Sequence, residues 1–61
     1  MTATAAKRQR ILIVEDDFEI AAVYTEQLQL ALNAVVKHTH DGGQAASYLR
    51  SEPFDAAIID I

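Results

Sequence analysis

Residues 11–17 read Ile-Leu-Ile-Val-Glu-Asp-Asp, an apolar run that ends in three consecutive acids. Because most of its apolar residues are β-branched and no polar residue interrupts it, the run predicts a strand buried on both faces, as in a parallel sheet. A second such run, residues 56–59, is followed directly by Asp60. The carboxyl ends of parallel neighbours meet at one edge of a sheet, so we expect Asp60 to lie near Glu15 and Asp16.

Length and composition limit the class of protein. A chain of 61 residues is at most one small domain, and 51% hydrophobic with 23% charged residues is typical of a globular chain. The absence of Cys excludes a disulfide framework and a thiolate metal site, and it is consistent with a cytoplasmic protein. No apolar run approaches the ~18 residues that cross a bilayer. A net charge of −4 disfavours direct contact with nucleic acid.

The first part of the chain predicts a lead-in and a long helix. Residues 1–10 predict a flexible lead-in, whose basic residues Lys7, Arg8 and Arg10 we expect to be solvated. Residues 18–32 predict a helix, with Asp17 as its N-cap and Asn33 in the left-handed conformation that ends helices. Its apolar residues have the spacing of one helical face: Ile20, Val23, Tyr24, Leu28, Ala31 and Leu32.

The second part of the chain predicts a strand, a short helix and a final strand. Residues 34–38 are short and β-branched, as an edge strand would be. Asp41 with Gln44 three residues later resembles a capping box, and Pro53 disfavours continuation of the helix that follows. The order β-α-β-α-β predicts an α/β fold with a parallel sheet and right-handed crossovers.

The predicted edge of the sheet carries several carboxylates: Glu15, Asp16, Asp17 and Asp60. Adjacent like charges require solvent, a proton or a cation. Oxygen ligands without Cys suit Mg²⁺ or Mn²⁺ rather than zinc or copper. A carboxylate beside such an ion can attack a phosphoryl group and form an acyl phosphate.

Together these segments resemble the amino-terminal half of a two-component response-regulator receiver domain. The matching pieces, in the family's order, are residues 11–17, the Asp-Gly-Gly-Gln-Ala run at 41–45, and the Pro-Phe-Asp-Ala-Ala-Ile-Ile-Asp run at 53–60. The resemblance covers residues 10–61. It implies a truncated flavodoxin-like fold with a three-stranded parallel sheet in the order 2-1-3, residues 11–61 being the half of the domain that ends after the third strand.

The resemblance also implies site residues and partners. Asp60 would be the phospho-acceptor, Asp16 a direct Mg²⁺ ligand and Glu15 a ligand through water, so the metal set is Glu15, Asp16 and Asp60. The phosphoryl group would come from a sensor histidine kinase or phosphotransfer protein in the cytoplasm. The parent would be a signalling phospho-acceptor rather than an enzyme with a separate substrate, and would act through an output domain, for example a transcription regulator. Asp17 falls one position past the family's acidic pair and is interpreted as a helix cap or solvated acid, with a site role as the alternative.

The family pattern continues with features beyond these 61 residues: a backbone carbonyl two residues past the acceptor, a Ser or Thr on a fourth strand and a Lys on a fifth. We therefore expect the isolated fragment not to be competent for phosphorylation. The open edge of the third strand and a bare sheet face predict self-association, for instance a symmetric dimer that pairs the third strands. The alternative function is a self-associating or partner-binding module in which the acids do no chemistry.

Some other residues permit two interpretations. His38 and His40 point the same way from a strand and predict a solvated strand end, with a weak metal pair as the alternative. Tyr24 and Tyr48 are predicted to pack on the sheet. A Mg²⁺-dependent hydrolase with an Asp nucleophile is a third class, but its nucleophile is usually followed two residues later by a second Asp, and here Asp16 is followed by Phe18.

Overall fold

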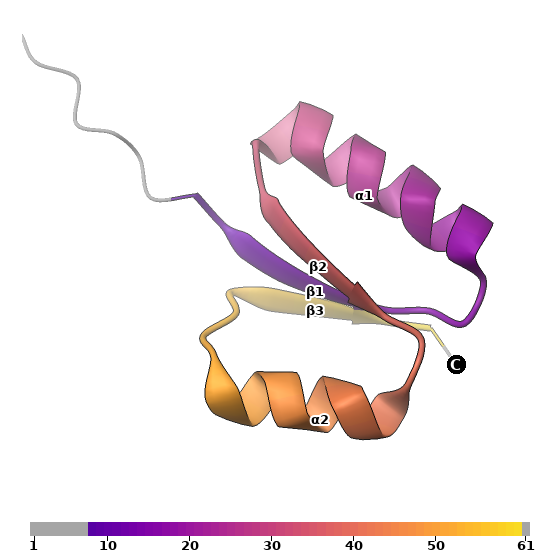
Figure 1. Cartoon of the computed structure of the whole chain (residues 1–61). Coiled ribbons are helices and arrows are strands. Elements are labelled where there is room, and N and C mark those ends of the chain that lie inside the picture. The colour runs from indigo at the N-terminus through magenta and orange to yellow at the C-terminus, as the bar shows by residue number, and fades with distance from the viewer. Residues whose placement is uncertain (1–7, 61) are drawn as a thin grey trace, which may run out of the picture.

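The structure is a computed structural model of the chain and describes residues 8–60. Its elements are, in order, β1 (Arg10–Val14), α1 (Phe18–Leu32), β2 (Val35–Thr39), α2 (Gly42–Ser51) and β3 (Ala56–Ile59). β1 pairs in parallel with both other strands, so the strand order is β2-β1-β3. The two helices lie on opposite sides of the sheet (Figure 1). The predicted α/β fold and its strand order are confirmed.

The beginning of β1 lies inside the stretch predicted as a lead-in. Arg10 is already part of the strand and pairs with Val35. Arg8 is exposed, and it also donates to the carbonyl oxygens of Asn33 and Ala34, at 2.9 and 3.2 Å. Residues 1–7, with Lys7, lie outside the described residues. β2 spans residues 35–39, one residue later than predicted.

The predicted limits of α1 are confirmed because its caps form as the sequence indicates. The Asp17 carboxylate accepts from the N–H groups of Glu19 and Ile20 at 2.9 and 3.2 Å. At the other end Asn33 has φ of 52°, and its N–H donates to the Gln29 carbonyl at 3.0 Å. Both helix ends therefore satisfy backbone groups that have no partner within the helix.

The start of α2 has its predicted cap but not the full capping box. The Asp41 carboxylate accepts from the Gly43 N–H at 2.9 Å. The Asp41 N–H donates instead to the Thr39 hydroxyl at 3.2 Å, and that hydroxyl donates to the Gln44 side chain at 2.5 Å. The buried Thr39 therefore takes the place that a direct bond from Asp41 to Gln44 would have had.

The core forms on the two faces of β1. Leu12 and Val14 pack with Ala45 of α2, and the partly buried Tyr48 and Phe54 contact this cluster. Ile11 and Ile13 are also buried, and strand alternation directs them to the opposite face, where α1 lies. The predicted packing of Tyr48 is confirmed.

The apolar face predicted for α1 is only partly buried. Ala21 is the buried residue of this helix, whereas the side chains of Ile20, Val23, Tyr24, Leu30 and Leu32 are exposed. Tyr24, which is predicted to pack on the sheet, is 38% exposed, so its packing is incomplete. The small side chain of Ala21 allows close approach of the helix to the sheet.

β3 is the least covered element. It pairs only with β1, its Ala56 and Ala57 side chains are exposed, and Ile59 is 58% exposed. The expectation of an open edge strand is confirmed for the described residues. Among residues 8–60 we find no helix with the length and apolar character needed to cross a membrane.

Candidate functional site

The carboxyl ends of β1 and β3 bring the predicted acids together. Val14 and Ile59 are register partners, so Glu15 and Asp60 follow at adjacent strand ends. The Asp60 N–H donates to the Val14 carbonyl at 2.9 Å, and the Glu15 N–H donates to the Thr39 carbonyl of β2 at 3.0 Å. We call Glu15, Asp16 and Asp60 the acidic edge.

Glu15 is the buried member of the acidic edge, at 3% exposure. Its Oε1 accepts from the Asp17 N–H at 3.0 Å, but its Oε2 is buried without a hydrogen-bond partner. The bond from Asp17 lowers the pKa of Glu15, but the carboxyl groups of Asp60 and Asp16 and the burial raise it, and the net shift is upward. A buried carboxylate beside other carboxylates is stabilised by a proton or by a cation.

The other acidic residues differ in whether their carboxylates are bonded within the chain. Asp16 and Asp60 are exposed at this edge, whereas Asp17 uses its carboxylate to cap α1. The interpretation of Asp17 as a helix cap is confirmed. A shallow surface depression beside the acidic edge is lined by Asp16, Asp17, Phe18 and Glu19.

The fit of a metal ion depends on the coordination that it demands. Within residues 8–60 no three or more His, Asp or Glu side chains form a set that could hold a metal ion. Mg²⁺ does not need such a set, because it keeps several waters and is bound through one or two carboxylates. The orphaned Glu15 Oε2 and the neighbouring Asp60 and Asp16 carboxyls are the donors that such an ion would use.

Two histidines lie beside the acidic edge in an arrangement that the sequence did not predict. The Phe18 ring lies 5.5 Å from the ring of His38 and 5.5 Å from that of His40, measured between centroids. His38 Nε2 lies 2.8 Å from the Glu15 carbonyl oxygen, so this nitrogen carries the proton that the bond requires. The predicted solvated strand end is therefore partly ordered by Phe18. The i, i+2 spacing of His38 and His40 was visible in the sequence, but their contact with Phe18 of α1 joins residues that are far apart in the sequence.

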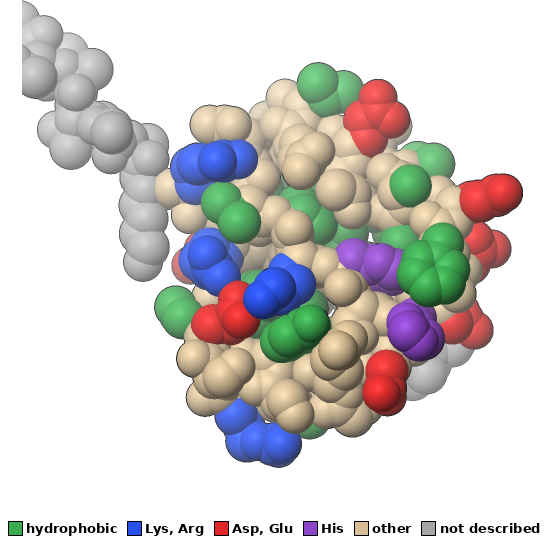
Figure 2. Space-filling view, viewed as in Figure 1, with side chains coloured by type: hydrophobic (Ala, Val, Ile, Leu, Met, Phe, Trp, Pro, Cys, Tyr) green, Lys and Arg blue, Asp and Glu red, His purple; other side chains and the backbone are tan. Residues whose placement is uncertain are grey.

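Charge is unevenly distributed over the molecule. On the face shown in Figure 2, most acidic side chains lie toward the end to which the strands run, next to the two histidines, and the Lys and Arg side chains lie mostly toward the opposite end. In the described part of the chain the ion pairs are those of Glu52 with Arg10 and Lys37, which lie away from the acidic edge. No ion pair within that part neutralises the acidic edge.

Comparisons with protein-family models, with curated proteins and with solved structures found no match to this chain. The function is therefore argued from the residues and their geometry.

Proposed function

We propose that the chain is the amino-terminal part of a receiver-like phospho-acceptor domain, which acts in the cytoplasm and takes its phosphoryl group from a histidine kinase or phosphotransfer protein. Asp60 is the acceptor, and Mg²⁺ is bound by Asp16 and Asp60, with Glu15 as a ligand through water. The observation that carries the proposal is the state of Glu15, a buried carboxylate with one orphaned oxygen and a pKa raised by Asp60 and Asp16. A bound cation would give the orphaned oxygen a partner and offset the repulsion among the carboxylates.

The exposure of the acids fits their proposed roles. Asp60 is exposed, so a phosphodonor can reach its carboxylate, while the buried Glu15 can hold an ion from the protein side. In the transfer, an Asp60 oxygen forms a bond to phosphorus as the bond from phosphorus to the donor's imidazole nitrogen breaks. When bound, Mg²⁺ offsets the repulsion between the carboxylate and the phosphoryl oxygens. The product is an acyl phosphate on Asp60, so the chain is an acceptor rather than an enzyme with a separate substrate.

The first test asks whether the acidic edge binds a divalent cation. In a titration of the ¹⁵N-labelled chain with Mg²⁺, we expect amide shifts confined to residues 15–17 and 60. Asp60→Asn and Asp16→Asn should weaken the response. Glu26→Gln, in the exposed middle of α1, is the matched control that also removes one negative charge. Uniform small shifts, or equal loss in all three variants, would contradict a specific site.

The second test asks whether Asp60 takes up phosphate. A protein that contains this segment within a complete sheet, incubated with Mg²⁺ and an acyl phosphate, is expected to gain one phosphoryl group that hydroxylamine releases, and Asp60→Asn should gain none. The 61-residue chain alone is expected to gain little, because the cations of its described part lie elsewhere: Arg8 bonds to backbone carbonyls, Arg10 and Lys37 pair with Glu52, and Arg50 lies in the last turn of α2. Labelling of the Asp60→Asn protein to the same level would remove the assignment.

A second candidate function is an assembly or partner-binding module. The exposure of β3, with Ile59 at 58% and Ala56 and Ala57 also exposed, supports it because an open apolar edge strand is a template for pairing. In a symmetric dimer that pairs β3 with β3 about a two-fold axis at Ile58, no acidic residue would lie directly opposite another. Sedimentation equilibrium tests this candidate. A dimer that Mg²⁺ does not affect and that Ile59→Lys dissociates would favour it, whereas a monomer at high concentration would exclude it.

A further inference from the structure

The register between β3 and β1 determines where Asp60 lies, yet β3 itself does little to select that register. Its four residues are Ala56, Ala57, Ile58 and Ile59, of which Ile58 is half-buried and the others are exposed. Register is strongly specified where one face of a strand is buried and weakly specified where it is not. The alignment of β3 must therefore be set largely from outside the strand.

Arg10, the first residue of β1, contacts four successive residues of the segment that leads into β3. Its guanidinium donates from Nη2 to the Glu52 carboxylate at 2.7 Å and from Nε to the Pro53 carbonyl at 2.9 Å. The same group lies 5.6 Å from the centre of the Phe54 ring. Its backbone exchanges two bonds with Asp55, each 2.8 Å long: the Arg10 N–H donates to the Asp55 carboxylate, and the Asp55 N–H donates to the Arg10 carbonyl.

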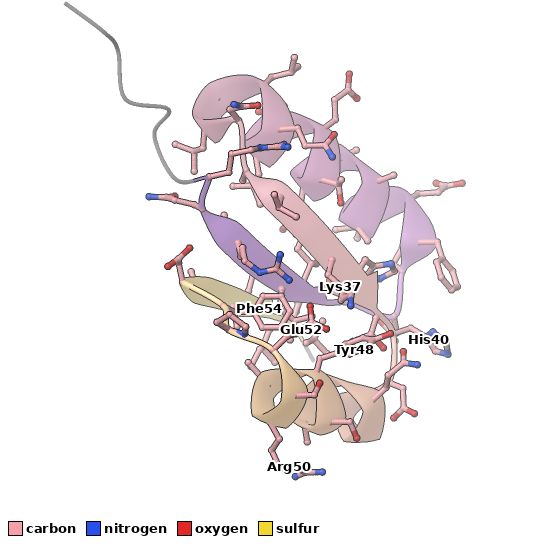
Figure 3. The ribbon with its side chains drawn as sticks, turned by 60° about the vertical axis from the view of Figure 1, so that its left-hand side comes forward. Lys37, His40, Tyr48, Arg50, Glu52 and Phe54 are labelled. Atoms are coloured by element: carbon pink, nitrogen blue, oxygen red, sulfur yellow. The ribbon has the colours of Figure 1, made fainter. Side chains whose placement is uncertain are left out.

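Lys37 shares the Glu52 carboxylate but makes none of the other contacts. It donates to Glu52 at 2.8 Å and lies 4.4 Å from the centre of the Tyr48 ring, so it links β2 to α2. Figure 3 shows Lys37, Glu52 and Tyr48 near one another where the end of α2 meets the sheet, with Phe54 beside them. Lys37 is therefore a matched control, since it pairs with the same carboxylate but has none of the contacts that Arg10 makes with residues 53–55.

We propose that Arg10 is the positioning residue of the acidic edge: its contacts with residues 52–55 fix the register of β3, and thereby place Asp60 beside Glu15. Val14 is the fourth residue after Arg10, which corresponds to roughly 13 Å along the strand. A slip of two residues keeps each side chain on its face but displaces Asp60 by roughly 7 Å. Such a slip would remove the bond from the Asp60 N–H to the Val14 carbonyl.

The shape of the guanidinium matters as much as its charge. Nε and Nη2 bond two different acceptors, one on the end of α2 and one on the loop, from one planar group. A Lys ammonium carries the same charge but lacks this fixed fork, so it cannot reproduce the pair of bonds in the same geometry. Arg10→Lys is therefore expected to act in the same direction as Arg10→Ala while leaving the net charge unchanged.

Two amides at the acidic edge report the two strand pairings separately. The Asp60 N–H belongs to the pairing of β3 with β1, and the Glu15 N–H, bonded to Thr39, belongs to the pairing of β1 with β2. We expect Arg10→Ala and Arg10→Lys to lower the hydrogen-exchange protection of the Asp60 N–H at least tenfold more than that of the Glu15 N–H. Lys37→Met should lower both to the same degree. Equal loss at both amides in the Arg10 variants, or no loss at Asp60, would overturn the proposal.

The significance of this positioning rests on the proposed function, because the acidic edge is taken to be the working site. Titration of the same variants with Mg²⁺ tests that connection, and we expect several-fold weaker binding with Arg10→Ala or Arg10→Lys but not with Lys37→Met. If the unsubstituted chain binds no Mg²⁺, the proposed function fails, while the comparison of the two amides still decides whether Arg10 sets the register.

Discussion

Glu15 and Glu52 lie at opposite ends of the same sheet and differ in almost every electrostatic respect. At the amino end the Lys37 ammonium, with a smaller contribution from Arg10, holds the pKa of Glu52 below its ordinary value against the effect of burial. Both Glu52 oxygens are bonded, one to each cation. At the carboxyl end the bond from Asp17 is outweighed by Asp60, burial and Asp16, and the pKa of Glu15 is raised. One of its oxygens has no partner.

The difference indicates which end of the sheet the fold completes by itself. The charges around Glu52 are neutralised within the chain, so this end serves the structure. The charges around Glu15 are of one sign and destabilise the fold that gathers them, which is characteristic of sites that bind or react. The acidic edge is therefore the end at which the proposed Mg²⁺ would offset the negative charge.

The largest expected effect tests whether one core supports both ends. Leu12 is fully buried in the middle of β1. Leu12→Ala should destabilise the chain by about 2–5 kcal/mol, because it removes buried methyl groups from the cluster with Val14 and Ala45. Chemical denaturation measures this, and Leu30→Ala, at an 81% exposed position, should stay within about 0.5 kcal/mol of the parent. Persistence of either end in Leu12→Ala, seen as protected amides there, would mean that the two ends are supported separately.

The second prediction tests the contrast between Glu15 and Glu52 by removing the charge of each side chain in turn. Glu15→Gln should raise Tm at pH 7, because it removes a carboxylate from between Asp60 and Asp16. Glu52→Gln should lower Tm, because Lys37 and Arg10 lose their shared anion. Both variants change the net charge equally, so each is the control for the other. Thermal unfolding at low ionic strength measures the two shifts, and shifts of the same sign would refute the contrast.

The pH dependence of these shifts follows from the pKa directions. A folded-state pKa raised above 4.5 means that Glu15 disfavours the fold increasingly as pH rises through that pKa, so the benefit of Glu15→Gln should vanish in acid. A folded-state pKa below 4.5 means that Glu52 stabilises the fold above pH 4.5 and loses this effect as pH falls through its folded pKa. The penalty of Glu52→Gln should therefore disappear at the lowest pH. A constant penalty over that range would show that packing, not charge, is lost.

The third prediction concerns the proposed binding of Mg²⁺ at the acidic edge. An ion that binds only the folded chain should stabilise it by about 1.4 kcal/mol at a free concentration ten times its Kd. Asp60→Asn should lose this gain, whereas Glu52→Gln, at the other end, should retain it. Denaturation with and without Mg²⁺, at constant ionic strength, measures the effect. An equal gain in both variants would mean that the ion does not act at Asp60.

The smallest expected effect separates the two exposed acids next to Glu15. Asp17→Ala should destabilise the chain by about 1 kcal/mol, because the N–H groups of Glu19 and Ile20 lose the acceptor that caps α1. It should leave Mg²⁺ affinity nearly unchanged. Asp16→Ala should do the reverse, with little effect on stability and weaker Mg²⁺ binding. If the two variants behave alike, the distinction between cap and ligand is wrong.

The sequence predicted the elements well because their signals are local. The Asp17 cap and the Asn33 terminus gave the limits of α1, and the two apolar runs ending in acids predicted parallel neighbours. The face of α1 was less predictable, because apolar residues surround much of this helix and periodicity cannot tell that the small Ala21, rather than Ile20, contacts the sheet.

Contacts between distant residues were not predictable from the sequence. Arg10 looked like part of a solvated lead-in, since its partners lie more than forty positions away at residues 52–55. The rings of His38 and His40 likewise lie near the Phe18 ring only because the end of β2 and the start of α1 are at the same edge of the sheet. The acidic edge could be predicted because the order of strands and helices places the carboxyl ends of parallel strands at one edge of the sheet. The burial of Glu15 depends on contacts that only the structure shows.

The central place of β1 has a consequence for synthesis on the ribosome. Among the described strands β1 emerges first, whereas its second neighbour, β3, is made only after β2. β1, α1 and β2 form a continuous unit that is available once residue 39 is free, although two strands and one helix are marginal alone. Nascent chains halted before residue 52 would lack residues 52–55, the segment that Arg10 contacts ahead of β3, so we expect the growing polypeptide to resist proteolysis only after that segment has been made.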